Sequence, residues 1–192
     1  MRVITFFFLS LNSFVVQGQS EPQNDSLIYW DERELEWSDF TARVGLLEEI
    51  MGEAISYCTV LASTIDKDSC LYYEIYTVFN TNHSWVSGIQ SSELLRHEQL
   101  HFDIVELHSR KIRKAIIDGV TQGDSQEEVG KRITSLINEV SVVQNDYDDE
   151  TLHGQDADRQ QEWVTKVRDS LKQYESYSSP TGNVFFPTSQ ND

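Results

Sequence analysis

The residues best suited to chemistry form one short motif, His97-Glu98-Gln99-Leu100-His101. On a helix, histidines four positions apart lie on one face, where both imidazoles can bind a single Zn²⁺. Glu98 would then take a proton from a zinc-bound water, whose pKa the metal lowers to about 7. The motif therefore predicts metal-assisted hydrolysis, provided that the chain supplies a third ligand.

A catalytic zinc needs three protein ligands and one position for water. An uninterrupted helix would place His108 about 10 Å beyond His101 along the axis, out of reach of the same ion. His153 and Glu150 remain, in the acidic segment 145–154, which we predict to be a loop that folds back over the helix. His153 is the preferred third ligand. Glu150 is the alternative, which would give a site of two histidines and one glutamate.

Three further side chains have predicted supporting roles. Tyr147, near the proposed third ligand, could donate its hydroxyl to the oxyanion of a tetrahedral intermediate. Asp103 and Glu106 could accept the free N–H of a ligating imidazole and so fix its tautomer. Each role has a structural alternative, which is packing for Tyr147 and a surface charge for the two acids.

The hydropathy pattern predicts the elements that must position these residues. Alternating apolar and β-branched residues indicate strands over 54–62 and 71–79. The apolar spacing then changes to a helical period, with Ser91 or Ser92 as the cap of a long helix that ends near Gly119. A second helix is predicted to begin at Asp124, and a third contains Trp163 and Leu171. The fold class is therefore α+β and zincin-like, with a small antiparallel sheet followed by a long active-site helix and two further helices.

The N-terminal segment is typical of export. Residues 1–18 carry one positive charge at Arg2 and an apolar run that polar residues interrupt, which predicts a cleaved signal peptide. The run is too short to span a bilayer, and no later stretch is apolar enough, so we expect no membrane span. Residues 19–192 have the size of a single domain. We therefore expect an exported protein that is secreted or periplasmic.

The acidic composition argues against two classes of binding partner. The formal net charge of −17 makes binding to nucleic acid or to an anionic membrane surface unfavourable.

Export favours a disulfide between Cys58 and Cys70. A tight hairpin turn over 66–69 would instead pair Cys70 with Ile65 and place Cys58 about 24 Å away. The sequence leaves both alternatives open.

The chain resembles a bacterial family, domain of unknown function 922, whose members are described as secreted zinc-dependent proteases. The resemblance covers most of the chain after residue 18 and rests on the motifs at 35–40, 84–86, 94–107 and 147–154. It implies that His97 and His101 are zinc ligands and that Glu98 is the general base, and it favours His153 over Glu150. Leu100 departs from the small residue expected there, which affects packing under the helix.

The leading hypothesis is a secreted zinc metalloprotease that cleaves peptide or protein substrates. An exposed strand edge near residues 72–85 could align an extended peptide by strand addition. One alternative is an inactive binding module in which zinc ties the acidic segment to the long helix and a fourth ligand closes the water position. Another is a zinc amidase of small substrates, which would have a closed pocket instead of an open groove. The sequence makes no prediction of the oligomeric state.

Overall fold

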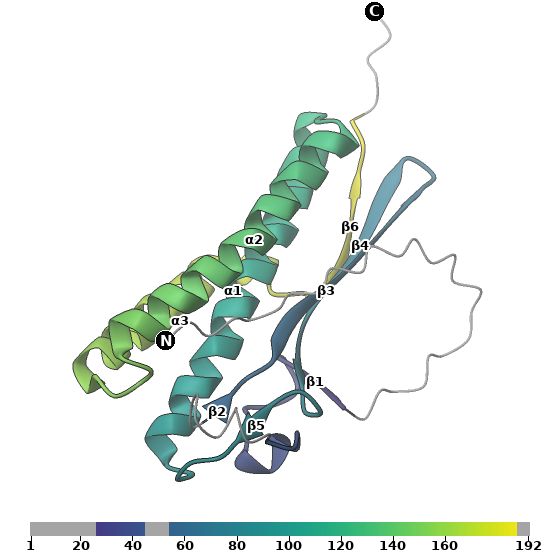
Figure 1. The fold of residues 1–192 in the computed structure, drawn as a ribbon. Helices are drawn as coiled ribbons and strands as arrows, with labels where there is room; N and C mark the ends of the chain where they lie inside the picture. The colour runs from purple at the N-terminus through teal and green to yellow at the C-terminus, as the bar shows by residue number, and fades with distance from the viewer. Residues whose placement is uncertain (1–25, 45–53, 188–192) are drawn as a thin grey trace, which may run out of the picture.

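The computed structural model describes residues 26–44 and 54–187, and the expected signal peptide at 1–18 lies outside them. The protein is α+β, as predicted, with antiparallel sheets and three helices (Figure 1). In chain order the elements are β1 Leu27–Tyr29, the 3-10 helix η1 Trp37–Asp39, β2 Ala54–Ile55, β3 Cys58–Lys67, β4 Cys70–Asn80, β5 Trp85–Val86, α1 Ser92–Gln122, α2 Gln126–Thr151, α3 Ala157–Gln173, the 3-10 helix η2 Glu175–Tyr177 and β6 Thr181–Phe185.

The main sheet is built around β4. Strand β3 pairs with β4 along its whole length on one side, and β1 and β6 share the other side. Strands β2 and β5 form a separate two-stranded sheet. The strand predicted over 71–79 is confirmed as β4, whereas the one predicted over 54–62 is divided between β2 and the longer β3, which belong to different sheets. The short strands β1, β5 and β6 were not predicted. The sheet therefore contains a C-terminal strand that follows the helices.

The β3–β4 hairpin settles the state of the two cysteines. Its turn consists of Asp68 and Ser69, whose φ angles of 55° and 60° suit a two-residue turn that matches the twist of the strands. Cys70 consequently pairs with Lys67, and the predicted pairing with Ile65 is wrong because the turn takes two residues instead of four. Cys58 lies at the other end of the hairpin, and both thiols are free. The disulfide alternative is therefore excluded.

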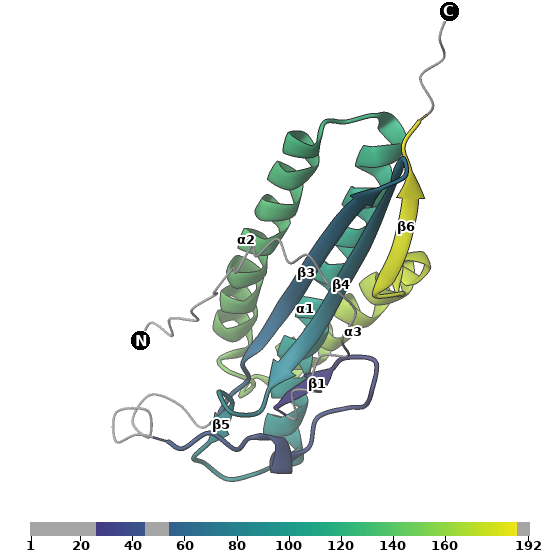
Figure 2. The ribbon, with the colours of Figure 1, turned by 90° about the vertical axis from the view of Figure 1, so that its right-hand side faces the viewer.

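Helix α1 is the central element of the fold. The hydroxyl of Ser91 accepts a hydrogen bond from the amide of Leu94 at its start, and Gly123, with a φ of 77°, closes its end. One side of α1 packs against β4 through Phe102 and Ile112, and the other side packs against α2 and α3 (Figure 2). None of the described helices has the length and hydropathy that a membrane crossing requires.

Helix α2 extends further than predicted. Ser125 and Glu128 form its capping box, one position later than expected, and the helix continues to Thr151. The acidic segment 145–154 is therefore helical over most of its length, and its prediction as a loop is wrong. Buried residues at a helical spacing explain the continuation, since Gln144, Tyr147 and Thr151 face the interior while Asp146, Asp149 and Glu150 face solvent. This packing outweighs the low helix propensity of the aspartates in the segment.

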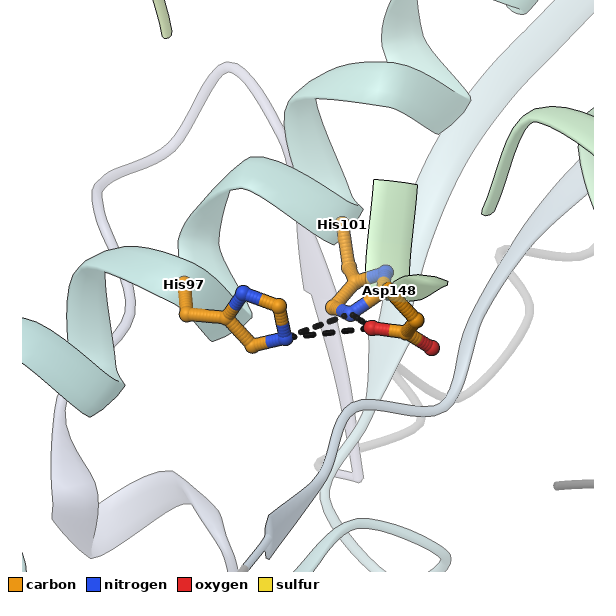
Figure 3. Close-up of side chains that lie close together, drawn as sticks. All are labelled: His97, His101 and Asp148. Carbon is orange, nitrogen blue, oxygen red and sulfur yellow. Dashed lines mark hydrogen bonds and ion pairs between the residues drawn. The ribbon is translucent and has the colours of Figure 1, made fainter. Parts of the chain in front are cut away.

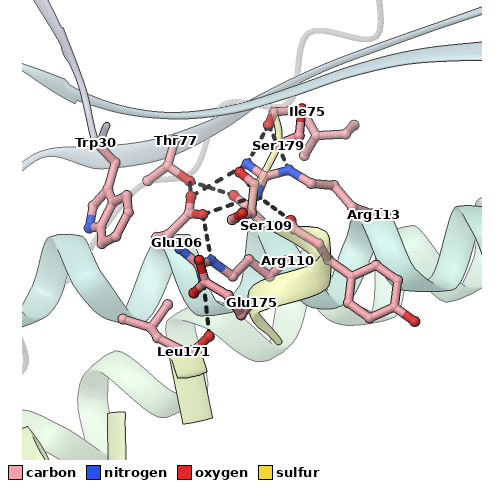
Figure 4. Close-up of polar contacts among 12 residues, drawn as sticks. Trp30, Ile75, Thr77, Glu106, Ser109, Arg110, Arg113, Leu171, Glu175 and Ser179 are labelled. Carbon is pink, nitrogen blue, oxygen red and sulfur yellow. Dashed lines mark hydrogen bonds and ion pairs between the residues drawn. The ribbon is translucent and has the colours of Figure 1, made fainter. Parts of the chain in front are cut away.

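A buried charge network fixes α1 to its surroundings (Figure 4). The carboxylate of Glu106 accepts hydrogen bonds from Arg110, Arg113 and the hydroxyl of Thr77 on β4. The guanidinium of Arg113 also donates to the carbonyl of Ile75 on β4 and to carbonyls at the end of η2, and that of Arg110 donates to a carbonyl of α3. Because these three charged residues are at most 4 % exposed, their charges are stabilised by one another and by the carbonyl groups around them instead of by water.

Replacing Glu106 by alanine is therefore expected to lower the free energy of unfolding by about 3–5 kcal/mol, because it leaves Arg113 buried without its counter-ion and Arg110 with only the exposed carboxylate of Glu175. Urea denaturation of the variant measures the loss. Glu162→Ala is the matched control, since Glu162 forms an exposed ion pair with Arg159 on α3 and should change stability little. Equal losses in the two variants would contradict the structural role of the network.

Candidate metal centre

His97 and His101 lie on one face of α1, as the motif spacing predicts. Their Nε2 atoms are 3.2 Å apart, and the two rings meet edge to face with their centroids 4.8 Å apart. The side chain of His97 is 3 % exposed and that of His101 is 13 % exposed. The two Nε2 atoms therefore face each other in a largely buried position.

Helix α2 adds a carboxylate to this pair. The Oδ1 atom of Asp148 lies 3.1 Å from Nε2 of His97 and 3.0 Å from Nε2 of His101 (Figure 3). Tetrahedral zinc with bond lengths of about 2.0–2.1 Å separates its ligand atoms by about 3.3 Å. The three atoms thus have close to the spacing of three corners of a tetrahedron. Asp148 is a site residue that the sequence reasoning missed.

Two glutamines orient the imidazoles. The Oε1 atom of Gln160 on α3 lies 3.2 Å from Nδ1 of His97, and that of Gln144 on α2 contacts Nδ1 of His101. The amide nitrogen of Gln144 donates to the carbonyl of His101, which directs its oxygen toward the ring. Because an amide oxygen can only accept, each Nδ1 carries the hydrogen of the neutral ring and each Nε2 has a free lone pair.

Asp103 and Glu106 do not have the tautomer-fixing role that we considered for them. Asp103 accepts hydrogen bonds from the indole of Trp30 and the amide of Gln99. Glu106 belongs to the arginine network, so neither carboxylate contacts an imidazole. The glutamines take this role instead. The spacing of Gln144 to Asp148 would have indicated its role only if residues 145–151 had been recognised as helical, and Gln160 lies on a different helix, so no local spacing relates it to the site.

Tyr147 lies behind the histidines. Its ring stacks on His97 with a centroid distance of 4.6 Å and meets His101 edge to face at 4.9 Å. The side chain is fully buried, and its hydroxyl lies 2.8 Å from Oε1 of Gln160 and 3.2 Å from the carbonyl of His97. Burial raises the pKa of Tyr147, so the phenol stays protonated. Its position suits support of the His97 ring.

The charges of the cluster favour a cation between the three side chains. Burial acts to lower the pKa of His101, but the hydrogen bond and charge of Asp148 outweigh it and raise that pKa to about 9. Burial acts in the opposite direction on Asp148, and the two histidines hold the pKa of its carboxyl far below the usual range. The carboxylate thus attracts a positive charge at this point, either a proton on His101 or a metal ion.

The other residues predicted for the site lie around this cluster. Glu98 is 3 % exposed, and its charge contributes to the raised pKa of His101. Glu150, the alternative ligand, accepts a hydrogen bond from the indole of Trp163. His153 is 54 % exposed, and its Nδ1 lies 3.6 Å from Oδ1 of Asp148. Among the described residues, the group that could hold a metal consists of His97, His101 and Asp148, so ligation by His153 stays a prediction.

A left-handed turn closes the site after α2. Leu152, His153 and Gly154 have φ angles of 51°, 54° and 78°. Such a conformation costs about 1–2 kcal/mol at a residue with a side chain, so the surroundings must stabilise it at Leu152 and His153. A Cβ atom at position 154 would lie 2.9 Å from Cγ of His97. Only glycine therefore allows the turn to pack against the ring of His97.

The fold and this cluster define an α+β protein with a candidate metal centre of two histidines and one aspartate between two helices. Residues 80–154 match the family described as "Bacterial protein of unknown function (DUF922)". This segment contains α1, α2 and the turn at Gly154, and therefore the whole cluster. The match supports the resemblance seen in the sequence. No curated protein and no solved structure matches the chain.

Proposed function

We propose that the protein is a zinc-dependent hydrolase of peptide bonds, with His97, His101 and Asp148 as ligands and Glu98 as general base. The observation that carries the proposal is the triangle of two imidazole nitrogens and one carboxylate oxygen, 3.0–3.2 Å apart, with the buried Glu98 close enough for its charge to act on His101. Three such atoms need a positive charge between them, which a metal ion can supply in place of the proton on His101. We assign this cation as Zn²⁺ because imidazole nitrogen and carboxylate oxygen are its usual ligands.

The ligand set suits hydrolysis. A bound Zn²⁺ would polarise the scissile carbonyl and lower the pKa of a coordinated water. Two neutral imidazoles and one carboxylate leave one net positive charge on the ion, so much of its Lewis acidity remains. Glu98 takes the proton of the attacking water and passes it to the leaving nitrogen. Gln144 and Gln160 keep both imidazoles in the tautomer that the ligation needs.

One observation favours the second candidate function, a zinc-stabilised binding module without turnover. The cluster connects α1 to α2, and Gln160 extends the connection to α3, so a metal here would tie three helices together. Metal binding would then be coupled to folding. The two functions differ in coordination, because turnover needs a position for water and the module would use a fourth protein ligand.

Metal removal and readdition test the proposed function. The chain purified without its first 18 residues is expected to contain one zinc per molecule and to cleave some members of a fluorogenic peptide mixture. Activity should disappear with a chelator and return with Zn²⁺ but not with Mg²⁺, which prefers oxygen ligands. A protein that contains zinc, cleaves none of the peptides and loses its helical circular dichroism on chelation would contradict the hydrolase and support the module.

A further inference from the structure

We propose that His153 is a substrate-contacting residue of this site, which donates a hydrogen bond to the scissile carbonyl oxygen as negative charge develops on it. This inference rests on the proposed function. It assigns to His153 a role in place of metal ligation, and it gives the site the oxyanion donor that hydrolysis of an amide needs. Three features of the described residues carry it, namely the position of His153, the rigidity of its turn and the lack of a suitable hydroxyl at Tyr147.

The position of His153 is at the rim of the cluster. Its imidazole is 54 % exposed, in contrast to the largely buried rings of His97 and His101. Its Nδ1 lies 3.6 Å from the same oxygen of Asp148 that faces the two ligand nitrogens. The ring is therefore beside the cluster but outside the group of atoms that could bind one ion together, and it is open to a molecule that approaches from solvent.

The turn that carries His153 is rigid. The amide of His153 donates to the carbonyl of Asp148 at 2.8 Å, and the amide of Asp156 donates to the carbonyl of Thr151 at 2.9 Å. The hydroxyl of Thr151, which is fully buried, accepts from the amide of Gly154. Gly154 is in turn packed against the ring of His97. These contacts fix the backbone of His153 relative to both a ligand histidine and Asp148.

The oxyanion role considered for Tyr147 requires a hydroxyl that a substrate can reach. The side chain of Tyr147 is fully buried, and its hydroxyl has Gln160 and the carbonyl of His97 as neighbours. His153 is exposed and carries an N–H donor in either tautomer. Its Nδ1 is 3.6 Å from Oδ1 of Asp148, which is beyond hydrogen-bond distance, so an N–H on this atom is beside the cluster without being taken up by the carboxylate. Of the two residues, His153 is the one placed to contact substrate.

The test combines metal binding with binding of a transition-state mimic. Phosphinic dipeptides have a tetrahedral phosphorus with a negative oxygen in place of the scissile carbonyl, so they probe the proposed contact without turnover. His153→Ala is expected to keep one zinc per chain with unchanged affinity. It should weaken binding of the phosphinic peptides at least tenfold by calorimetry and lower kcat about 100-fold with little change in KM. His83→Ala, an exposed histidine elsewhere, is the matched control.

Each outcome decides the proposal. Loss of zinc in His153→Ala would show that His153 is a ligand, and unchanged phosphinic affinity and kcat would show that it contacts nothing; either result overturns the inference. The proposed function fails separately, if the wild-type protein cleaves no peptide. If the inactive wild-type protein still binds phosphinic peptides in a way that depends on His153, the contact of His153 with the ligand is supported although hydrolysis is not. If the zinc-loaded protein binds no phosphinic peptide at all, both the proposed function and this inference are overturned.

Discussion

Replacing Glu98 by glutamine is expected to lower the rate of peptide hydrolysis at least about 1,000-fold while the protein keeps its zinc. General-base catalysis contributes about 10²–10⁴-fold, and an amide cannot take the proton of the attacking water. Glu98 is not among the three residues of the ligand cluster, so the metal should stay bound. Glutamine has the size of glutamate and should fit the buried position without a cavity. Steady-state kinetics together with zinc analysis of the same sample measure both effects.

The control for this variant is Glu93→Gln. Glu93 lies in the first turn of the same helix, is exposed and does not belong to the cluster. Its replacement removes one negative charge from α1, as Glu98→Gln does, and is expected to leave kcat unchanged. Activity of Glu98→Gln at the level of this control would exclude a general base at position 98. Loss of zinc in Glu98→Gln would instead indicate that Glu98 is a ligand.

The sequence was most informative where local spacing decides the outcome. The separation of four residues between His97 and His101 is sufficient to place both rings on one helical face, because helix geometry alone sets that relation. The cap at Ser91 marks the start of the same helix through a side-chain preference. The predicted end near Gly119 is wrong, because Gly119 lies inside the helix against Val129 of α2, and the left-handed glycine that ends α1 is Gly123. The histidine spacing and the cap depend on residues at most a few positions apart, and the structure agrees with both.

The sequence was least informative where packing between distant segments decides. Residues 145–151 have a composition that disfavours a helix, yet the burial of Gln144, Tyr147 and Thr151 against α1 and α3 keeps them helical. This one difference changes the site, because Asp148 faces the histidines only if the helix continues past residue 145. Strand β6 was missed for the same reason, since Thr181–Phe185 is a strand only through its pairing with β4.

The largest expected effect on metal binding is that of Asp148→Asn. A structural zinc binds with about 10–16 kcal/mol over its ligands, so the loss of one anionic ligand should cost about 3 kcal/mol, or about 100-fold in affinity. An asparagine keeps the shape of the side chain but removes the charge that attracts the cation between His97 and His101. Competition with a chromogenic chelator measures the zinc affinity of the variant and of its wild type.

Two further variants make this measurement specific. Asp149→Asn changes the next residue of α2, which faces solvent, and is expected to bind zinc as the wild type does. His153→Ala separates the two possible ligand sets, because His153 is beside Asp148 but is more than half exposed. A large loss of affinity in Asp148→Asn together with none in His153→Ala assigns the third ligand to Asp148. The reverse result would restore His153 as the ligand and would mean that the turn at 152–154 moves inward when the metal binds.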